Sequence, residues 1–258
     1  MLNCRRWLAA ATTGLLAACS TMSTTADPPP LDGTAWVLAA LPGRILVPAV
    51  DVTLAFADGA ASGTDGCNRF RAPYTASGGR LDISPKGAST MMACPPAVME
   101  QASTYLASLT RASTWRVAAG QLELLSREGT LLASFSPQAT QLAGTRWRVT
   151  AVNNGRQAVV GIVTGSTLTM AFGTDGRVTG SSGCNSYTAT WNQEGDRLNL
   201  GPPAATRLPC AQVAVMEQEQ QFLRAFGTVA TARQEASRLE LRTAAGAMAI
   251  TLVREAAP

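Results

Sequence analysis

Cysteine is the residue type in this 258-residue chain best suited to chemistry, and four of its six cysteines fall into two pairs of similar spacing. Cys67 with Cys94 is one pair, and Cys184 with Cys210 is the other. A cysteine nucleophile needs a general base, and the chain contains no histidine to serve as one. Two thiols are too few for a structural zinc site, and no Cys-x-x-Cys motif supports thiol redox catalysis. The pairs therefore favour one disulfide each, with buried free thiols as the alternative, because only geometry decides whether a bridge can close.

Each cysteine pair belongs to a longer set of motifs that occurs twice in the same order. The motifs are Gly-Thr-x-Trp ending at Trp36 and Trp147, Gly-x-x-Gly-Cys-Asn ending at Asn68 and Asn185, Thr-x-x-x-Cys ending at Cys94 and Cys210, and Met-Glu-Gln beginning at Met99 and Met216. This self-similarity predicts a tandem duplication of one domain, over residues 31–136 and 142–254. Each unit is too long for a solenoid repeat and long enough for a hydrophobic core of its own.

The Gly-Cys-Asn step is the strongest candidate for a functional locus in each copy. It places Gly66 and Asn68 around the first cysteine, and Gly183 and Asn185 around its counterpart. Glycine and asparagine together permit an unusual backbone turn, and asparagine is well suited to bonding its own backbone at a bend. We therefore interpret these four residues as a structural turn and predict no catalytic residue.

Short strands separated by turns, with one helix inserted, are the elements expected in each copy. In the first copy residues 52–56 alternate with period two, and Asp58-Gly59 supplies a tight hairpin turn. Apolar residues three or four apart over 96–110 indicate one amphipathic helix. Pro73 removes a ladder donor, which predicts an edge or bulged strand. The pattern predicts an α+β fold, with a curved antiparallel sheet of about six to eight strands packed on one α-helix in each domain.

The repeated motifs resemble those of the META domain, the family that includes the heat-inducible lipoprotein HslJ. The resemblance covers both copies and implies a curved, partly open antiparallel barrel around a helix, similar to the cracked barrel of a type III secretion pilotin. It also implies a role in envelope stress and in tolerance of certain antibiotics, with no enzymatic activity. The chain departs from the family pattern at Pro73 and at Ser186, where arginine is more usual.

The N-terminus has the pattern of an export signal. Arg5 and Arg6 precede the apolar run 7–16, which is too short to span a bilayer as a helix. Small residues before Cys19 resemble the lipobox of a bacterial lipoprotein, so we expect residues 1–18 to be removed and Cys19 to be lipidated. An ordinary signal peptide with an incidental cysteine is the alternative.

Residues 19–30 are expected to form a disordered tether, because serine, threonine and three consecutive prolines leave almost nothing apolar to bury. Ser20 is not aspartate, and by analogy with bacterial sorting rules the lipid anchor then lies in the outer membrane, on its periplasmic face. An exported address agrees with disulfide formation, which needs an oxidising compartment.

The composition argues against some functions and points to none. The formal net charge of +4 comes from 21 basic and 17 acidic residues, and loss of Arg5 and Arg6 with the signal removes two positive charges. The remaining charge is too weak and too scattered to predict nucleic-acid binding. No metal and no cofactor are predicted.

Three non-catalytic functions follow from these patterns. The first is a lipid-anchored cell-envelope protein of the META type that binds a partner during envelope stress. The second is a carrier of an apolar ligand, such as a lipid, in a half-open barrel, and the third is a pilotin-like secretion accessory. Trp36 and Trp147 are expected in the core, with the lining of a ligand cavity as the alternative. An enzyme is disfavoured because histidine, metal ligands and nucleophile motifs are missing.

Overall fold

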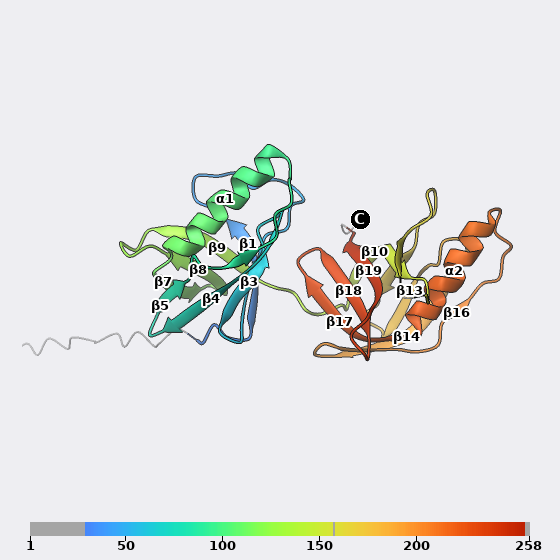
Figure 1. Cartoon of the computed structure of the whole chain (residues 1–258). Helices are drawn as coiled ribbons and strands as arrows, with labels where there is room; N and C mark the ends of the chain where they lie inside the picture. The colour runs from blue at the N-terminus through green and yellow to red at the C-terminus, as the bar shows by residue number, and fades with distance from the viewer. Residues whose placement is uncertain (1–28, 157, 256–258) are drawn as a thin grey trace, which may run out of the picture.

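The computed structural model describes residues 29–156 and 158–255 and shows two bodies of strands, each with one helix, joined by a short connection (Figure 1). The expected signal segment, residues 1–18, and the lipidation site Cys19 lie outside the described residues. Of the expected tether 19–30, only Pro29 and Pro30 are described, and both are exposed.

The first domain is a meander of antiparallel strands with α1 inserted after the short strand β6. Its elements are β1 (Thr34–Ala40), β2 (Thr53–Ala57), β3 (Ala60–Thr64), β4 (Arg69–Ser77), β5 (Arg80–Ile83), β6 (Ala88–Ser89), α1 (Pro96–Arg111), β7 (Thr114–Ala118), β8 (Gln121–Leu125) and β9 (Leu131–Pro137). Strand β9 pairs with β1 and β3 pairs with β4, so eight strands close into a ring, while β6 pairs with β4 outside it.

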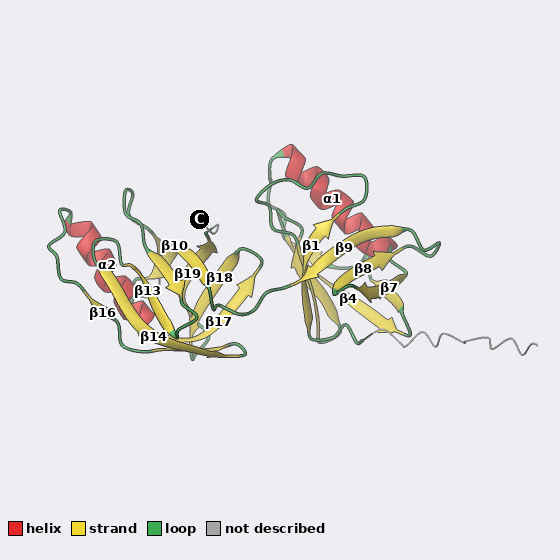
Figure 2. Ribbon diagram, turned by 180° about the vertical axis from the view of Figure 1, so that it is seen from behind, coloured by secondary structure: helices red, strands yellow, loops and turns green. Residues whose placement is uncertain are grey.

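The second domain repeats this topology. Its elements are β10 (Thr145–Asn153), β11 (Val159–Gly161), β12 (Thr169–Phe172), β13 (Arg177–Ser181), β14 (Ser186–Glu194), β15 (Arg197–Leu200), β16 (Ala204–Ala205), α2 (Val213–Phe226), β17 (Val229–Glu235), β18 (Arg238–Thr243) and β19 (Met248–Arg254). Pairing of β10 with both β12 and β19 closes the second ring, and β11 and β16 lie outside it. In Figure 2 the helix of each domain runs beside the strands.

The pairing corrects the prediction of a partly open barrel, because every strand of each ring has two neighbours. Closure removes the unpaired edges that an open sheet would expose. In each ring, one seam between neighbouring strands has a ladder of a single residue pair. Arg80 pairs with Thr114 between β5 and β7, and Arg197 pairs with Thr231 between β15 and β17. Both seams lie where the helix interrupts the meander, so no hairpin holds those strands together.

Side chains fill both rings. Phe56 from a strand and Tyr105 and Leu109 from α1 belong to one core cluster, and Phe222 and Phe226 from α2 belong to the other. An eight-stranded ring encloses an interior just wide enough for side chains, so large aromatics are sufficient to fill it. Each helix thus contributes its buried face to the core of its own domain.

The two tryptophans of the Gly-Thr-x-Trp motif are core residues, as predicted. Trp147 is fully buried and donates Nε1–H to the hydroxyl of Thr145 at 2.7 Å, and that hydroxyl donates to the Leu142 carbonyl at 2.5 Å. Trp36 makes the same bond to Thr34 at 2.8 Å. The threonine therefore gives the buried indole its hydrogen-bond partner, which is the physical reason for the motif.

Local sequence explains the first hairpin and the first helix. Asp58 and Gly59 both have positive φ, 52° and 69°, as the tight turn between β2 and β3 requires. Helix α1 begins at Pro96, where proline costs no hydrogen bond, and ends at Arg111, one residue beyond the predicted end. Among the described residues, no helix is both long and apolar enough to cross a membrane.

The prediction that Pro73 marks an edge or bulged strand is wrong. Strand β4 pairs with β3 and with β5 in regular register, so it is interior to the ring. Pro73 lies opposite Ser84, just past the end of β5, and there its carbonyl accepts from Ser84 N at 2.9 Å. The missing proline N–H therefore falls in the gap between the pairing of β4 with β5, which ends at Tyr74, and its pairing with β6 at Phe70 and Arg71.

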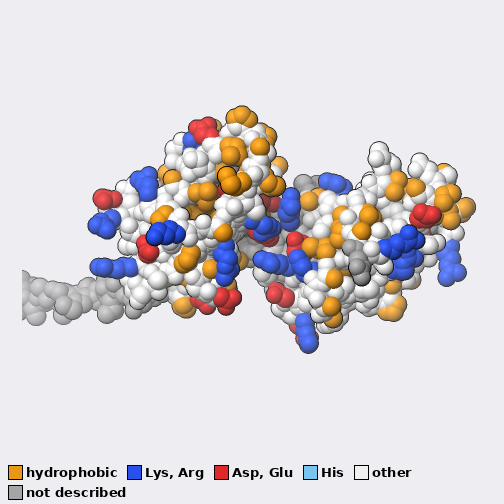
Figure 3. Space-filling model, viewed as in Figure 1, with side chains coloured by type: hydrophobic (Ala, Val, Ile, Leu, Met, Phe, Trp, Pro, Cys, Tyr) orange, Lys and Arg blue, Asp and Glu red, His pale blue; other side chains and the backbone are white. Residues whose placement is uncertain are grey.

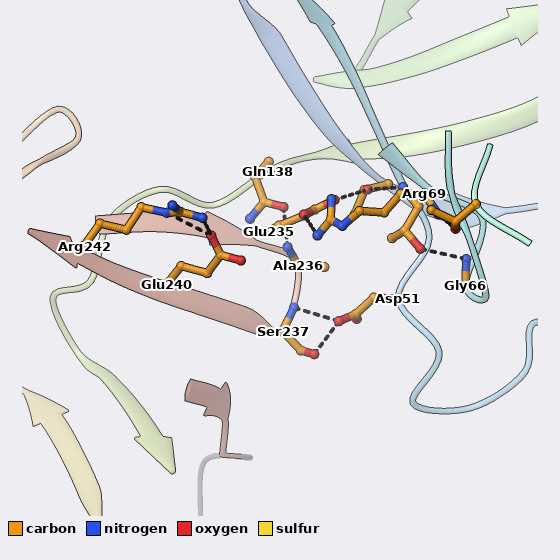
Figure 4. Close-up of polar contacts among 12 residues, drawn as sticks. Asp51, Gly66, Arg69, Gln138, Glu235, Ala236, Ser237, Glu240 and Arg242 are labelled. Atoms are coloured by element: carbon orange, nitrogen blue, oxygen red, sulfur yellow. Dashed lines mark hydrogen bonds and ion pairs between the residues drawn. The ribbon is translucent and has the colours of Figure 1, made fainter. Parts of the chain in front are cut away.

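The domains touch through the turn between β17 and β18. The Asp51 carboxylate of the first domain accepts hydrogen bonds from the Ser237 backbone N–H, at 3.1 Å, and from the Ser237 hydroxyl. Gln138, in the connection between the domains, accepts from the Ala236 N–H at 2.6 Å. Figure 4 shows this hairpin tip reaching the first domain.

Candidate functional site

Both predicted cysteine pairs are disulfides in the structure. Cys67 is joined to Cys94 with a Cα–Cα distance of 5.9 Å, and Cys184 to Cys210 with 5.8 Å, within the usual range for a bridge. Each bridge links the corner before β4 or β14 to the loop that leads into the helix. It therefore ties the start of the helix to the barrel.

Asn68 and Asn185 have structural roles, but not the bonds predicted for them. The Oδ1 of Asn68 accepts from the Thr90 hydroxyl at 2.9 Å and from Met92 N at 2.7 Å, more than twenty residues away in sequence. Asn185 accepts from Leu208 N at 2.7 Å in the same way. Each asparagine thus holds the loop before the helix instead of its own backbone, and it does so beside the disulfide.

A buried carboxylate forms the corner itself in the first copy. Asp65 is 2% exposed, and its Oδ1 accepts the backbone N–H of Cys67 at 2.8 Å and that of Asn68 at 2.6 Å. Two charge-assisted bonds to backbone donors commit this carboxylate to holding the turn. Sequence reasoning did not single out Asp65.

In the second copy the carboxylate comes from the helix. Ser182 occupies the position of Asp65, and Glu219 of α2 accepts from Asn185 N at 3.0 Å and from the Ser182 hydroxyl at 2.7 Å. The residue of α1 that corresponds to Glu219 is Ala102. Each copy therefore has one carboxylate at this corner. In the first copy it comes from the turn before β4, and in the second copy it comes from the helix.

The glycines of the step are required by the backbone. Gly66 has φ 99° and Gly183 has φ 114°, a region that other residues rarely adopt. A Cβ on Gly66 would lie 2.5 Å from Val50 Cγ1, and one on Gly183 would lie 2.9 Å from Ser166 Oγ. Conformation and space both exclude a side chain there.

The first glycine of the Gly-x-x-Gly-Cys-Asn motif allows a second close approach. A Cβ on Gly63 would overlap the Thr53 carbonyl, and that carbonyl accepts a hydrogen bond from the Tyr105 hydroxyl at 2.9 Å. The tyrosine is fully buried, and burial together with the nearby Asp65 carboxylate raises its pKa well above the ordinary value. Tyr105 therefore stays neutral and acts as a donor inside the core.

The second copy supplies this hydroxyl from a strand. Tyr187 of β14 donates to the Thr169 carbonyl at 2.9 Å, while Phe222 occupies the helix position that corresponds to Tyr105. In the first copy the strand position is Phe70, whose ring centroid lies 5.9 Å from that of Tyr105. The hydroxyl and the plain ring have thus changed places between strand and helix.

The glutamine of Met-Glu-Gln fastens a third segment to the helix. Gln101 accepts from Val47 N at 2.7 Å, and Gln218 accepts from Val163 N at 2.6 Å. Val47 lies between β1 and β2, and Val163 lies in the equivalent segment of the second domain, between β11 and β12. Disulfide, asparagine and glutamine therefore assemble two loops around the N-terminal end of each helix.

These loops, the first turns of the helices and the short strand β11 carry exposed apolar side chains, which we call the helix-end surface. In the first domain they are Ile45, Met91, Met92 and Met99, and in the second Val159, Leu208, Val213 and Met216. Met91 is 96% exposed and Leu208 is 65% exposed. Figure 3 shows hydrophobic side chains gathered over the end of α1 at the top of the first domain. Large contiguous apolar patches on folded proteins are typical of contact sites.

A pocket with a mainly apolar lining lies beside α1, and it is small. This pocket between α1 and the β4–β6 region, lined by Phe70, Ile83 and Leu109 among others, has a volume of about 150 Å³. Ligand pockets for drug-sized molecules start at roughly 300 Å³. Within residues 29–156 and 158–255, no group of three or more potential ligand residues is placed to hold a metal ion.

Fold and site define a tandem pair of closed antiparallel rings, each stapled by a disulfide beside its helix. The META domain family model matches residues 29–139 and 140–256, so the chain belongs to the META domain family and contains the domain twice.

Solved structures similar to the chain match about one domain of it. An NMR structure of a protein from Burkholderia xenovorans shares 21% identity, with 45% of this chain and 85% of that chain covered and a TM-score of 0.39. A crystal structure of a DUF4847 family protein from Bacteroides vulgatus shares 16% identity, with 45% and 96% covered and a TM-score of 0.31. No curated protein matches the chain closely enough to count as a relative.

Proposed function

We propose that this protein is a non-catalytic, lipid-anchored component of the bacterial cell envelope that binds a protein partner through the helix-end surface. The observation that carries the proposal is the occurrence of exposed apolar side chains at the same end of both copies. The sequence pattern around Cys19 supports an outer-membrane address through a lipid anchor, and the resemblance to the META family supports a role in envelope stress tolerance.

Packing favours a partner outside the domain over a ligand inside it. The side chains of Phe56, Tyr105 and Phe135 in the first ring, and of Trp147 and Phe222 in the second, are fully buried. They occupy the space that an acyl chain would need. The exposed methionines of the first domain, by contrast, are flexible and polarizable side chains suited to an adaptable protein contact.

A photo-crosslinking residue placed at Met92 and, separately, at Leu208 tests the partner in living cells. We expect both positions to crosslink to the same envelope protein, because the two surfaces are equivalent. The same residue at Gln121, which is exposed on β8 away from the helix end, is the control and should give no product. Crosslinks to lipid at Met92 would favour the carrier, and no specific product at either position would contradict the proposal.

The anchor is tested independently by Cys19→Ala. We expect this variant to leave the membrane fraction or to accumulate as unprocessed precursor, because the acyl chains are attached to that sulfur. Normal processing and unchanged membrane association would show that Cys19 is not the anchor.

A further inference from the structure

A cleft at the domain junction is lined by more arginines than carboxylates. It has a volume of about 270 Å³, and its lining residues are Arg69, Arg233, Glu235, Arg238, Glu240 and Arg242. Arg69 begins β4 of the first domain, and the other five project from the β17–β18 hairpin of the second. Figure 3 shows basic side chains gathered where the two domains meet.

The two carboxylates of the cleft are already paired. Glu235 accepts from Arg69 at 2.7 Å and from the Thr53 hydroxyl at 2.8 Å. Glu240 accepts from Arg242 Nη2 at 2.7 Å and from its Nε at 3.2 Å. Both pairs are drawn in Figure 4.

Arg233 and Arg238 are left without a carboxylate. In the ladder Arg233 lies opposite Glu240 and Arg238 lies opposite Glu235, yet neither has an ion-pair partner among the described residues. Among its lining residues, four guanidinium groups against two carboxylates give the cleft an excess of two positive charges. Walls of low dielectric concentrate the field of such charges in the cleft.

The first copy shows that this charge is not a requirement of the fold. In the equivalent hairpin, Arg116 pairs with Glu123 at 2.5 Å, so the counterpart of Arg233 is neutralised. At the three other positions the first copy has Ala118, Gln121 and Leu125, where the second has Glu235, Arg238 and Arg242. The extra charges occur in the copy whose hairpin faces the junction.

We propose that this cleft binds a dianionic phosphoryl group, as inorganic phosphate or as a phosphate monoester, between Arg233 and Arg238. Guanidinium groups present planar pairs of N–H donors that match phosphate oxygens, and two of them balance two negative charges. The volume accommodates a phosphoryl group with a small substituent. Arg69 lines the same cleft from the first domain, so a bound phosphate contacts both domains and holds the junction closed.

Isothermal titration calorimetry of the full chain with inorganic phosphate, at constant ionic strength, tests the site. We expect saturable binding with one site per chain, weakened by about tenfold or more in Arg233→Gln and in Arg238→Gln, since each removes a charge-assisted contact. The matched control is Arg116→Gln, which removes the equivalent arginine of the first copy and should leave the affinity unchanged. Equal urea midpoints for all three variants establish that folding is intact.

A second titration, with short-chain dihexanoyl phosphatidic acid, distinguishes the source of the group. Affinity equal to that of inorganic phosphate indicates that the phosphoryl group alone is recognised, whereas tighter binding that is still lost in Arg233→Gln indicates a lipid headgroup. Absence of saturable binding by both probes, or unchanged binding in both cleft variants, overturns the proposal. The helix-end surface plays no part in this test, so its outcome is independent of the proposed partner.

Discussion

At the scale of the residue, Gly66 is the position where one added methyl group should be felt most. We expect Gly66→Ala to lower the free energy of unfolding by about 1 to 3 kcal/mol, because φ is 99° and the new Cβ meets Val50. Urea unfolding followed by tryptophan fluorescence measures the loss. Gly161→Ala, which has open space and needs no positive φ, is the control, and an equally small effect at both positions would contradict the account of the corner.

Asp65 is the second residue whose role can be isolated. Replacing it by serine leaves the N–H groups of Cys67 and Asn68 without their acceptor, which should cost about 2 to 3 kcal/mol. The exposed Asp82→Ser on β5 should cost almost nothing.

The second copy provides a rescue for this change. Asp65→Ser combined with Ala102→Glu rebuilds the arrangement of Ser182 and Glu219, so the double variant should regain part of the lost stability. Additive losses in the double variant would show that the two corners are not interchangeable.

At the scale of the element, the helix satisfies the Thr53 carbonyl in the first copy, and a strand satisfies the equivalent Thr169 carbonyl in the second. Tyr105→Phe leaves the buried Thr53 carbonyl without a partner, and we expect a loss of about 1 to 3 kcal/mol in unfolding free energy. Adding Phe70→Tyr should restore most of it, because Tyr187 performs this role from the equivalent strand of the second copy. The control is Tyr74→Phe, whose hydroxyl bonds Asp32 at the surface.

If Phe70→Tyr fails to restore the stability, the distance between barrel and helix in the first copy no longer suits a tyrosine on the strand. The measurement is a double-mutant cycle from urea midpoints, in which a coupling energy near zero contradicts the exchange.

At the scale of the whole molecule, the junction should loosen in acid. Burial raises the pKa of Glu235, but hydrogen bonds from Arg69 and Thr53 and the charges of Arg69 and Arg233 outweigh it, so the pKa lies below the ordinary 4.5. A carboxylate with a depressed pKa stabilises the contact above its ordinary pKa and loses that contribution as pH falls through the lower, folded value. The domain contact is therefore expected to be intact above pH 4.5 and to weaken progressively below it.

Resonance energy transfer between dyes on the two domains follows this change. Glu235→Gln should already be looser at neutral pH, and it should lose the part of the acid response that belongs to Glu235. A wild-type profile identical to that of Glu235→Gln would contradict a role for the Arg69–Glu235 pair.

Much of this architecture was predictable from local patterns. Alternation over 52–56 and helical spacing over 96–110 predicted β2 and α1, because both depend on neighbours within a few residues. Pro73 was misread because its ladder partner is decided by where β5 ends. The corner was recognised from its glycine and asparagine, yet Asp65 was missed because its partners are backbone N–H groups, which leave no signature in sequence.

By itself, the sequence determined that the domain is duplicated, which cysteines correspond, and roughly where several strands and the two helices lie, since repetition and periodicity are properties of the chain. Only the tertiary structure decided that each sheet closes on itself and which element supplies a shared carboxylate or hydroxyl. It also decided that Arg233 and Arg238 line one cleft together with Arg69. The physical reason is that these features arise between atoms brought together from distant parts of the chain, where packing and charge act through space.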